Sequence, residues 1–402
     1  MKIAYVILIG SNKIGVEKAI KEKANALISI GATNVDFIVL NPTRNQKDGI
    51  VKYIQYKRKI FPLTYYNRIF KRYSIIEENV NLNKYDYIIL RYANADKSGI
   101  DFVNTYNIIT EHHTDEISEY LSKLNTKLSN VLRINQKIRL NLERKYGAAI
   151  LQGCKGLIAV TDEIRKVELN RIHSKIPSII IPNGINVKSI KFTGFKRFDG
   201  KNLDIAIVAN HLSPWHGLDR FINALNHYKN DVNILLHIIG NINMTDLKNI
   251  TSNFKRIKFY GSKTGAELDD ILSKMQLAIS TLGLFRKKMK EACSLKTREY
   301  TARGLPFILA YNDPDLDHVN KNLKFYLLLE NNDSPIDIKK VINFVYQLNN
   351  DPKMKDISNY MRQYAFEHMD WKVKMKNYLQ LIDKINLYRP NNSLNNKIPY
   401  KF

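Results

Sequence analysis

Cysteine is almost missing from this chain of 402 residues, which contains only Cys154 and Cys293. Two cysteines so far apart form neither a disulfide framework nor a cluster of zinc ligands, which excludes the small disulfide-stapled secreted domains. Long apolar runs are missing too, because none approaches the roughly 20 residues that a helix needs to span a bilayer. The apolar run at 2–9 has no small-residue cleavage site after it, so we interpret it as a first β-strand and expect a cytoplasmic protein.

Acidic residues are scarce relative to basic ones. Asp and Glu total 38 against 63 for Lys and Arg, which gives a formal net charge of +25. Such an excess favours an anionic partner, whether nucleic acid, an anionic membrane surface or a phosphorylated ligand. Net charge does not choose among these, so the choice depends on motifs.

Short Ile- and Val-rich runs alternate with helical patterns in two successive series, which predicts right-handed βαβ units and parallel sheets covered on both faces. The expected fold class is α/β, with two Rossmann-like domains facing a cleft and a C-terminal helix crossing back to the first domain. The expected strands are 2–9, 35–40, 86–90, 106–110, 156–160, 178–181, 204–209, 233–239, 256–260, 276–280 and 306–310. The expected divisions are a first domain at 1–190, a linker at 191–202, a second domain at 203–370, a returning helix at 371–388 and a tail at 389–402.

The segment 291–306 contains the most informative motif. Glu291 and Glu299 are separated by seven residues, and Gly304 and Pro306 follow. This segment resembles the Glu-seven-Glu donor motif of retaining glycosyltransferases with the GT-B fold (the family 4 type), with Ser294 where that family usually has glycine. The resemblance implies that Glu299 holds the ribose of a nucleotide and that Glu291 faces the donor sugar.

The residues of this segment suit a diphosphate on physical grounds as well. Ser294 is a good N-cap for a helix over 295–303, and the free N–H groups at a helix start near Leu295 attract anions. Lys296 adds a positive charge there, and Arg298 is a second candidate donor contact. The alternative is a solvated helix on which Glu299 pairs with Lys296 or Arg303.

Two histidines in 208–220 occupy positions where the same family carries Arg and Lys for the donor diphosphate. They are His211 and His216. Histidine is largely neutral above its usual pKa of about 6.5, so each would hold a phosphate less strongly at pH 7. The alternative is a plain helix N-terminus with Ser213 as its cap and Pro214 at its first position.

A histidine pair, His112 and His113, follows the strand predicted at 106–110 and so faces the cleft. The family carries a histidine on this loop that contacts the donor sugar near its anomeric carbon. We favour His113, because it precedes Thr-Asp as in the family pattern, but His112 remains a candidate.

Three glycines complete the resemblance. Gly10 and Gly15 flank the loop after the first strand and resemble the family's acceptor-side loop, although a plain tight turn is the alternative. Gly261 follows the strand at 256–260, where the backbone would meet the nucleotide base.

Basic and aromatic residues interleave over 52–73, a composition that suits the surface of an anionic membrane. This predicts a peripheral protein on the inner face of the cell membrane, with a glycan or lipid-diphosphate-linked acceptor. The same composition fits single-stranded nucleic acid or a solvated basic face.

The predicted function is transfer of a sugar, of the hexosyl type, from a nucleoside diphosphate donor to an acceptor hydroxyl with retention, in capsule or other surface polysaccharide synthesis. No Asp-x-Asp metal clamp stands in a fitting place, so we expect no metal and no cofactor beyond the nucleotide sugar. Two alternatives remain: a GT-B-fold sugar-nucleotide epimerase, and a basic nucleic-acid-binding protein, which would not explain the spacing of Glu291 and Glu299.

Overall fold

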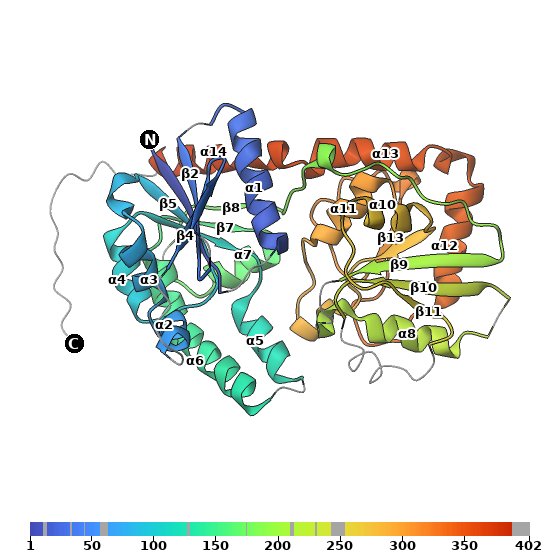
Figure 1. Ribbon diagram of the computed structural model, residues 1–402, viewed down its shortest axis with the longest axis horizontal. Coiled ribbons are helices and arrows are strands. Elements are labelled where there is room, and N and C mark those ends of the chain that lie inside the picture. The colour runs from blue at the N-terminus through green and yellow to red at the C-terminus, as the bar shows by residue number, and fades with distance from the viewer. Residues whose placement is uncertain are drawn as a thin grey trace.

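The computed structural model describes residues 1–10, 14–32, 34–43, 45–56, 63–126, 129–173, 175–209, 213–229, 231–242 and 254–387. These residues form two α/β domains that lie side by side, each on its own sheet (Figure 1). The fold class predicted from the sequence is confirmed.

The first sheet has the strand order β3-β4-β2-β1-β5-β6-β7-β8, counted over the described residues. Its neighbours are parallel, except for the antiparallel pair β3 and β4. Every residue of β1 is buried, as expected for a strand covered on both faces. The strands are β1 Ile3–Leu8, β2 Val35–Asn41, β3 Gln46–Asp48, β4 Val51–Gln55, β5 Tyr87–Arg91, β6 Ile108–His112, β7 Gly156–Ala159 and β8 Ser178–Ile180.

Two layers of helices cover this sheet. One face packs on α1 and α14, and the other packs on α3, α4 and α6. The helices of the first domain are α1 Ile14–Ser29, α2 Leu63–Phe70, α3 Arg72–Asn79, α4 Ser98–Thr105, α5 Glu116–Leu124, α6 Asn130–Gly153 and α7 Asp162–Leu169, with short turns η1 Leu82–Lys84 and η2 Val187–Ser189.

The second sheet is parallel, with the order β11-β10-β9-β12-β13-β14. Counted from β9, this is the Rossmann order 3-2-1-4-5-6, and it reverses between β9 and β12. Ligands of such sheets bind beyond the carboxyl ends of the strands at this reversal. The strands are β9 Asn202–Val208, β10 Asn233–Ile239, β11 Ile257–Phe259, β12 Leu277–Ile279, β13 Phe307–Leu309 and β14 Tyr326–Leu328.

The helices of the second domain pack against its sheet. They are η3 Pro214–His216, α8 Leu218–His227, α10 Gly265–Ser273, η4 Leu284–Lys287, α11 Leu295–Arg303, η5 Lys321–Leu323, α12 Ile338–Asn350, η6 Pro352–Met354, α13 Ile357–Tyr364 and the π-helical turn η7 Ala365–Met369. Among the helices within the described ranges, none is long and apolar enough to cross a membrane.

The chain crosses between the domains twice, and the two crossings are bonded to each other. The N–H of Ile185 donates to the carbonyl of Met369 at 2.9 Å, and the N–H of Trp371 donates back to the carbonyl of Ile185 at 3.1 Å. Helix α14, Trp371–Leu387, then packs its apolar side against α1 and β1 of the first domain (Figure 1). The last helix therefore joins the two domains.

The strands that sequence patterns did not predict are β3, β4 and β14. Strand β4 overlaps the start of 52–73, the segment that we interpreted as a basic surface. Val51 and Tyr53 alternate with less buried neighbours, so β4 turns one face into the core. The lysines and arginines in and around this strand made its alternation of buried and less buried residues hard to recognise in the sequence.

A substitution at Gly304 tests how tightly the chain packs at the end of α11. Its φ is +75°, and an added Cβ would lie 2.7 Å from Phe192 and 2.9 Å from Ser358. We expect Gly304→Ala to lower the free energy of unfolding by about 2–4 kcal/mol, through a left-handed backbone and overpacking together. Urea unfolding followed by circular dichroism measures this.

The control is Gly200→Ala, where φ is +84° but the nearest atom, of Tyr346, is 3.8 Å away. Only the backbone cost of about 1–2 kcal/mol applies there. If both variants lost the same free energy of unfolding, close packing at Gly304 would contribute nothing to the cost of Gly304→Ala.

Candidate functional site

The site is built around the N-terminus of α11, which lies at the junction of the two domains. Ser294 is its N-cap, and the Ser294 hydroxyl accepts a hydrogen bond from the N–H of Lys296 at 3.3 Å. Helix α11 spans Leu295–Arg303, as the sequence predicts. Leu295 remains 40% exposed, so the first turn of the helix is open to solvent.

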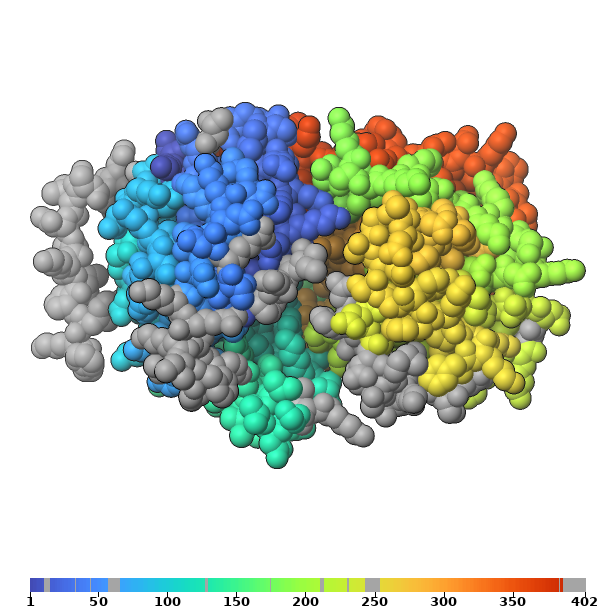
Figure 2. Space-filling view, viewed as in Figure 1, coloured from blue at the N-terminus to red at the C-terminus, as the bar shows by residue number. Residues whose placement is uncertain are grey.

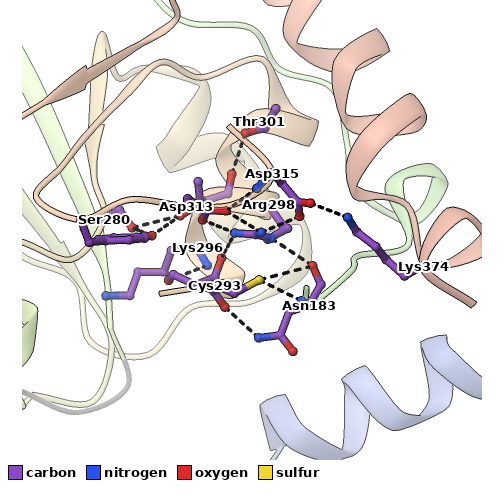
Figure 3. Close-up of polar contacts among 12 residues, drawn as sticks. Asn183, Ser280, Cys293, Lys296, Arg298, Thr301, Asp313, Asp315 and Lys374 are labelled. Carbon is purple, nitrogen blue, oxygen red and sulfur yellow. Dashed lines mark hydrogen bonds and ion pairs between the residues drawn. The ribbon is translucent and has the colours of Figure 1, made fainter. Parts of the chain in front are cut away.

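The ammonium group of Lys296 is buried and has no hydrogen-bond partner among the described residues. Burial lowers the pKa of Lys296 to about 8. Figure 3 shows this side chain directed away from the polar cluster on the other side of the helix. A buried ammonium without a partner is costly, so the geometry favours an anion beside it.

Arg298 is not available to a donor, and the prediction that it contacts one is wrong. Its side chain is fully buried and donates to both Asp313 oxygens and, at 2.6 Å, to Asp315 (Figure 3). Its Nε also donates to the carbonyl of Asn183 at 3.0 Å. Lys374 of α14 bonds the other Asp315 oxygen at 2.5 Å. Arg298 points inward because it lies two helical positions from Lys296, on a different face.

Glu299 forms the pair that the sequence left open as an alternative. It accepts from Arg303 at 2.9 Å, and Arg303 also bonds Asp269 at 2.5 Å. The Glu299 side chain is 25% exposed and lies close enough to Glu22 of α1 for their charges to interact. Its carboxylate is therefore reachable from the junction of the domains.

Glu291 lies between the domains rather than free in solvent. Its carboxylate accepts from the N–H of Glu163 at 3.0 Å, in the first turn of α7. Glu163 reciprocates by accepting from the N–H groups of Lys290 at 2.8 Å and Glu291 at 2.7 Å. This exchange fixes the loop before Ser294, and nothing in the sequence pattern indicated the part of Glu163.

His113 follows directly after β6, at the carboxyl end of the first sheet. Its side chain is 17% exposed, and its Nε2 lies 2.6 Å from Glu111 Oε1. Burial, with the positive charge of Arg91, lowers the pKa of His113 to about 4. Burial alone would raise the pKa of Glu111, but Lys23 and His113 hold it well below its usual range. Neutral His113 therefore donates from Nε2 to an ionised carboxylate, which leaves Nδ1 as an acceptor.

The candidacy of His112 is corrected by the structure. It is the last residue of β6, which extends two residues beyond the predicted strand, and its side chain is fully buried. Because neighbouring residues of a strand point to opposite faces, His112 points away from Glu111 and stacks on Tyr92 at 4.5 Å. Its described polar and ring neighbours on that face are Tyr92, Glu116 and Glu168.

Lys287 reaches across the junction from η4. Its ammonium lies 2.5 Å from the Thr114 hydroxyl and 3.2 Å from Glu119, and it sits 5.1 Å from the Trp215 ring. The two domains thus meet beside the loop that carries His113. Figure 2 shows a hollow in the surface between the two domains. Sequence reasoning missed Lys287, whose basic neighbours offer no distinguishing signal.

His216 is held in a capping arrangement. Its Nδ1 accepts from the N–H of Ser213 at 3.2 Å, which is the helix start that the sequence offered as an alternative. Gly217 follows with φ +66°, and a Cβ there would lie 2.6 Å from the backbone of Gly283. His211 lies outside the described residues.

The three predicted glycines differ in their surroundings. Gly261 has φ +68° and open space where a side chain would be, so its backbone is accessible. Gly15 lies in the first turn of α1 and also has no close neighbour. Gly10 accepts from Arg68 at 3.3 Å, and a Cβ would overlap that guanidinium. Residues 11–13 lie outside the described residues.

Several described side chains of the segment 52–73 face inward, so they are not part of the surface predicted for it, and the membrane contact stays a prediction. Tyr53, Tyr56, Arg72 and Tyr73 are buried, and Arg72 donates to the carbonyl of Leu8 at 2.7 Å. The described side chains that remain exposed in this segment are Gln55, Tyr66 and Lys71. Residues 57–62 lie outside the described residues, and the side chains of 63–65 do as well.

The state of His113 generates a pH prediction. An unfolded histidine takes up its proton near pH 6.5, whereas folded His113 takes it up near pH 4. The contribution of His113 to stability is therefore complete above pH 6.5 and is lost as the pH falls towards 4. In a nuclear magnetic resonance titration, the His113 signal should have its midpoint near pH 4.

The control is His113→Gln, which removes the signal and should make stability less steeply dependent on pH between 6.5 and 4. A midpoint at pH 6 or above would contradict the proposed neutral state of His113.

Comparison with known proteins finds no family model and no curated relative that matches, but it finds similar solved structures. A glycosyltransferase from Rickettsia africae is 15% identical, with 97% of this chain and all of that chain covered and a TM-score of 0.59. Anabaena Alr3699/HepE, solved with UDP and glucose, is 13% identical over 96% of this chain and all of that one, with a TM-score of 0.60.

WaaG, a glycosyltransferase involved in lipopolysaccharide biosynthesis, is 12% identical over 94% of this chain and 99% of that chain, with a TM-score of 0.62. The similarity extends over nearly the whole length of both chains. At these identities it shows the fold, and the fold of this chain is GT-B.

Proposed function

We propose that this chain is a glycosyltransferase that moves a sugar from a nucleoside diphosphate to an acceptor hydroxyl with retention at the anomeric carbon. The observation that carries the proposal is the buried, unpartnered ammonium of Lys296 at the start of α11. Helix N-termini bind phosphates, and this one lies at the junction of the domains in a GT-B fold. Anabaena HepE, with the same fold, was solved with UDP-glucose.

The diphosphate is proposed to lie against the N–H groups that follow Ser294, with Lys296 and His216 beside it. Glu299 would exchange Arg303 for the two ribose hydroxyls, and the open backbone at Gly261 would meet the base. His211 stays a predicted diphosphate contact. The charge of the helix terminus and Lys296 takes the place of a metal at the diphosphate, so we expect donor binding without a divalent ion.

The transfer is proposed to occur on one face of the sugar. The bond between the anomeric carbon and the phosphate oxygen breaks, and its electron pair leaves with the diphosphate. The acceptor oxygen bonds the same carbon from the same face and passes its proton to the departing phosphate oxygen. His113 Nδ1 and Glu291 would orient the sugar, and the Lys287 contact would help to exclude water.

The acceptor is proposed to be a glycan or lipid-diphosphate-linked sugar of a capsule or other surface polysaccharide, with hexose as the transferred group. The excess of basic residues suits such an anionic acceptor and the inner face of a membrane. Within the described part of 52–73, Tyr66 and Lys71 are the exposed aromatic and basic side chains for that contact.

Removing the charge of Lys296 should weaken catalysis. After a thermal-shift screen of nucleotide sugars identifies the donor, we expect Lys296→Met to cost about 2–4 kcal/mol in kcat/KM, because one preorganised charge on the leaving diphosphate is lost. Steady-state transfer assays measure this. Glu299→Gln should cost a similar amount, through the ribose.

The matched controls lie on α10: Lys274 and Glu267 form exposed pairs at 2.6 Å with Asp270 and Lys263. Lys274→Met and Glu267→Gln should leave turnover within twofold of the original. Unchanged turnover in both Lys296→Met and Glu299→Gln would rule out this donor site. Product formed without acceptor would instead favour an epimerase.

Donor binding should also depend on pH through Lys296. Burial lowers the pKa of Lys296 to about 8, so the free protein loses this proton above pH 8, whereas a bound diphosphate retains it. Affinity should be full below pH 8 and fall by about tenfold per pH unit well above it. Calorimetry in buffers of different ionisation enthalpy measures the proton uptake, which Lys296→Met should abolish. A donor affinity that does not change between pH 7 and pH 10 would contradict this prediction.

A further inference from the structure

Behind the loop that carries His113, on the opposite face of the first sheet, lies a buried cluster of polar side chains, which we call the pocket at His112. It is formed by His112 at the end of β6, Glu116 at the start of α5, Glu143 of α6 and Glu168 of α7. All four side chains are buried, with exposures of 4% or less. Neither the donor site nor the proposed reaction uses them.

Several polar atoms of this pocket have no hydrogen-bond partner within the described residues. They are both ring nitrogens of His112, Oε2 of Glu116 and Oε1 of Glu168. His112 Nδ1 lies 3.7 Å from the Glu116 oxygen and 3.9 Å from the Glu168 oxygen. One ligand atom from each of His112, Glu116 and Glu168 lies within 4.8 Å of the other two, so the three residues converge without hydrogen-bonding each other.

The charge of the pocket is unbalanced. Arg171 donates to Glu143 at 2.8 Å and to the other oxygen of Glu168 at 2.7 Å, and Glu143 further accepts from Tyr92 and from the N–H of Ala95. Three carboxylates against one guanidinium leave a charge of −2 if all are ionised. Buried charges are normally paired, so the fully ionised pocket would need two further positive charges.

A second cluster of possible ligands in the chain shows the contrast. Cys293, Asp313 and Asp315 also converge within 4.8 Å, but Arg298 and Lys374 supply two positive charges there. Their carboxylates are bonded, so that cluster needs no ion. The pocket at His112 is equally buried, but among the described residues its carboxylates have a single arginine, Arg171, as an ion-pair partner.

We propose that this pocket binds one divalent cation of the Zn²⁺ or Mn²⁺ class through His112 Nδ1, Glu116 Oε2 and Glu168 Oε1. Separations of 3.7 and 3.9 Å are close to those of two ligands of one ion with bonds of about 2.0–2.2 Å. One imidazole and two carboxylates suit first-row ions. A divalent ion would balance the charge of −2.

The cation is structural and does not touch the donor. Its ligands come from the end of β6, the start of α5 and the end of α7, so it ties together both ends of the segment 113–115. His113 lies in that segment, and its ring bonds Glu111 on the other face of the sheet. The ion would therefore hold the backbone that positions His113.

The test uses the full-length chain, freed of metal with a chelator and then titrated with Zn²⁺ or Mn²⁺. We expect one ion per chain by elemental analysis, and a rise in the thermal unfolding midpoint when the ion is restored. In Glu168→Gln we expect binding to weaken at least about tenfold. The amide oxygen can still accept from Arg171, so this variant should fold.

The most informative result is whether Glu168→Gln raises or lowers the thermal unfolding midpoint, measured with and without metal. Without metal, Glu168→Gln removes one charge from an anionic pocket and should unfold at the same or a higher temperature than the original chain. With metal restored, it should unfold at a lower temperature. The control is Asp204→Asn, which alters a carboxylate bonded to His237 at 2.8 Å in the second domain and should keep full metal binding.

The proposal is overturned if the original chain binds less than a tenth of an equivalent of either ion, or if Glu168→Gln binds the ions as tightly as the original. Either result would mean that protons or water, and no metal, satisfy the pocket. Binding of an ion is measured without donor or acceptor, so the outcome is independent of the proposed transfer reaction.

Discussion

The ion cluster of Arg298, Asp313, Asp315 and Lys374 is the interaction on which the geometry of the site depends. Arg298 belongs to α11, its two carboxylate partners follow β13, and Lys374 belongs to α14. Removing one partner of such a buried cluster typically costs about 3–5 kcal/mol, since a charge is left alone. The cluster therefore fixes the direction of α11 relative to the returning helix, and with it the place where the helix N-terminus meets the first domain.

The balance of buried charge distinguishes structural groups from groups that await a ligand. Arg298 and Lys374 match two carboxylates, and Lys23 matches Glu111 at 2.8 Å. Both sets are neutral and satisfied, and both join α14 to its surroundings, because Tyr378 also bonds Glu111. Lys296 instead has a positive charge with no hydrogen-bond partner among the described residues. Like the unpartnered atoms of the pocket at His112, it therefore differs from these neutral sets and has the character of a group that awaits a ligand.

Much of the fold could be predicted from the sequence, because parallel strands that are buried on both faces have continuous apolar sequences. The limits of α11 were predictable from Ser294 and Gly304, whose preferences are local. Strand β4 and the place of His112 were not predictable, since both depend on which neighbours cover the sheet. The Arg298 cluster was missed for the same reason. A charged side chain is expected at the surface unless its partners, which are distant in the sequence, are known.

The contacts across the cleft differ in kind from those at the crossing of the chain. At the crossing, Ile185 exchanges backbone hydrogen bonds with Met369 and Trp371, and α14 buries an apolar face on the first domain. Across the cleft, Lys287 bonds the hydroxyl of Thr114 and the partly exposed carboxylate of Glu119, and Glu163 and Glu291 exchange bonds between N–H groups and carboxylates. These are contacts of single polar side chains, whereas the crossing adds an apolar face. In the proposed reaction, a bound diphosphate sugar would replace the Lys287 and Glu291 contacts, which lie beside His113 and the start of α11.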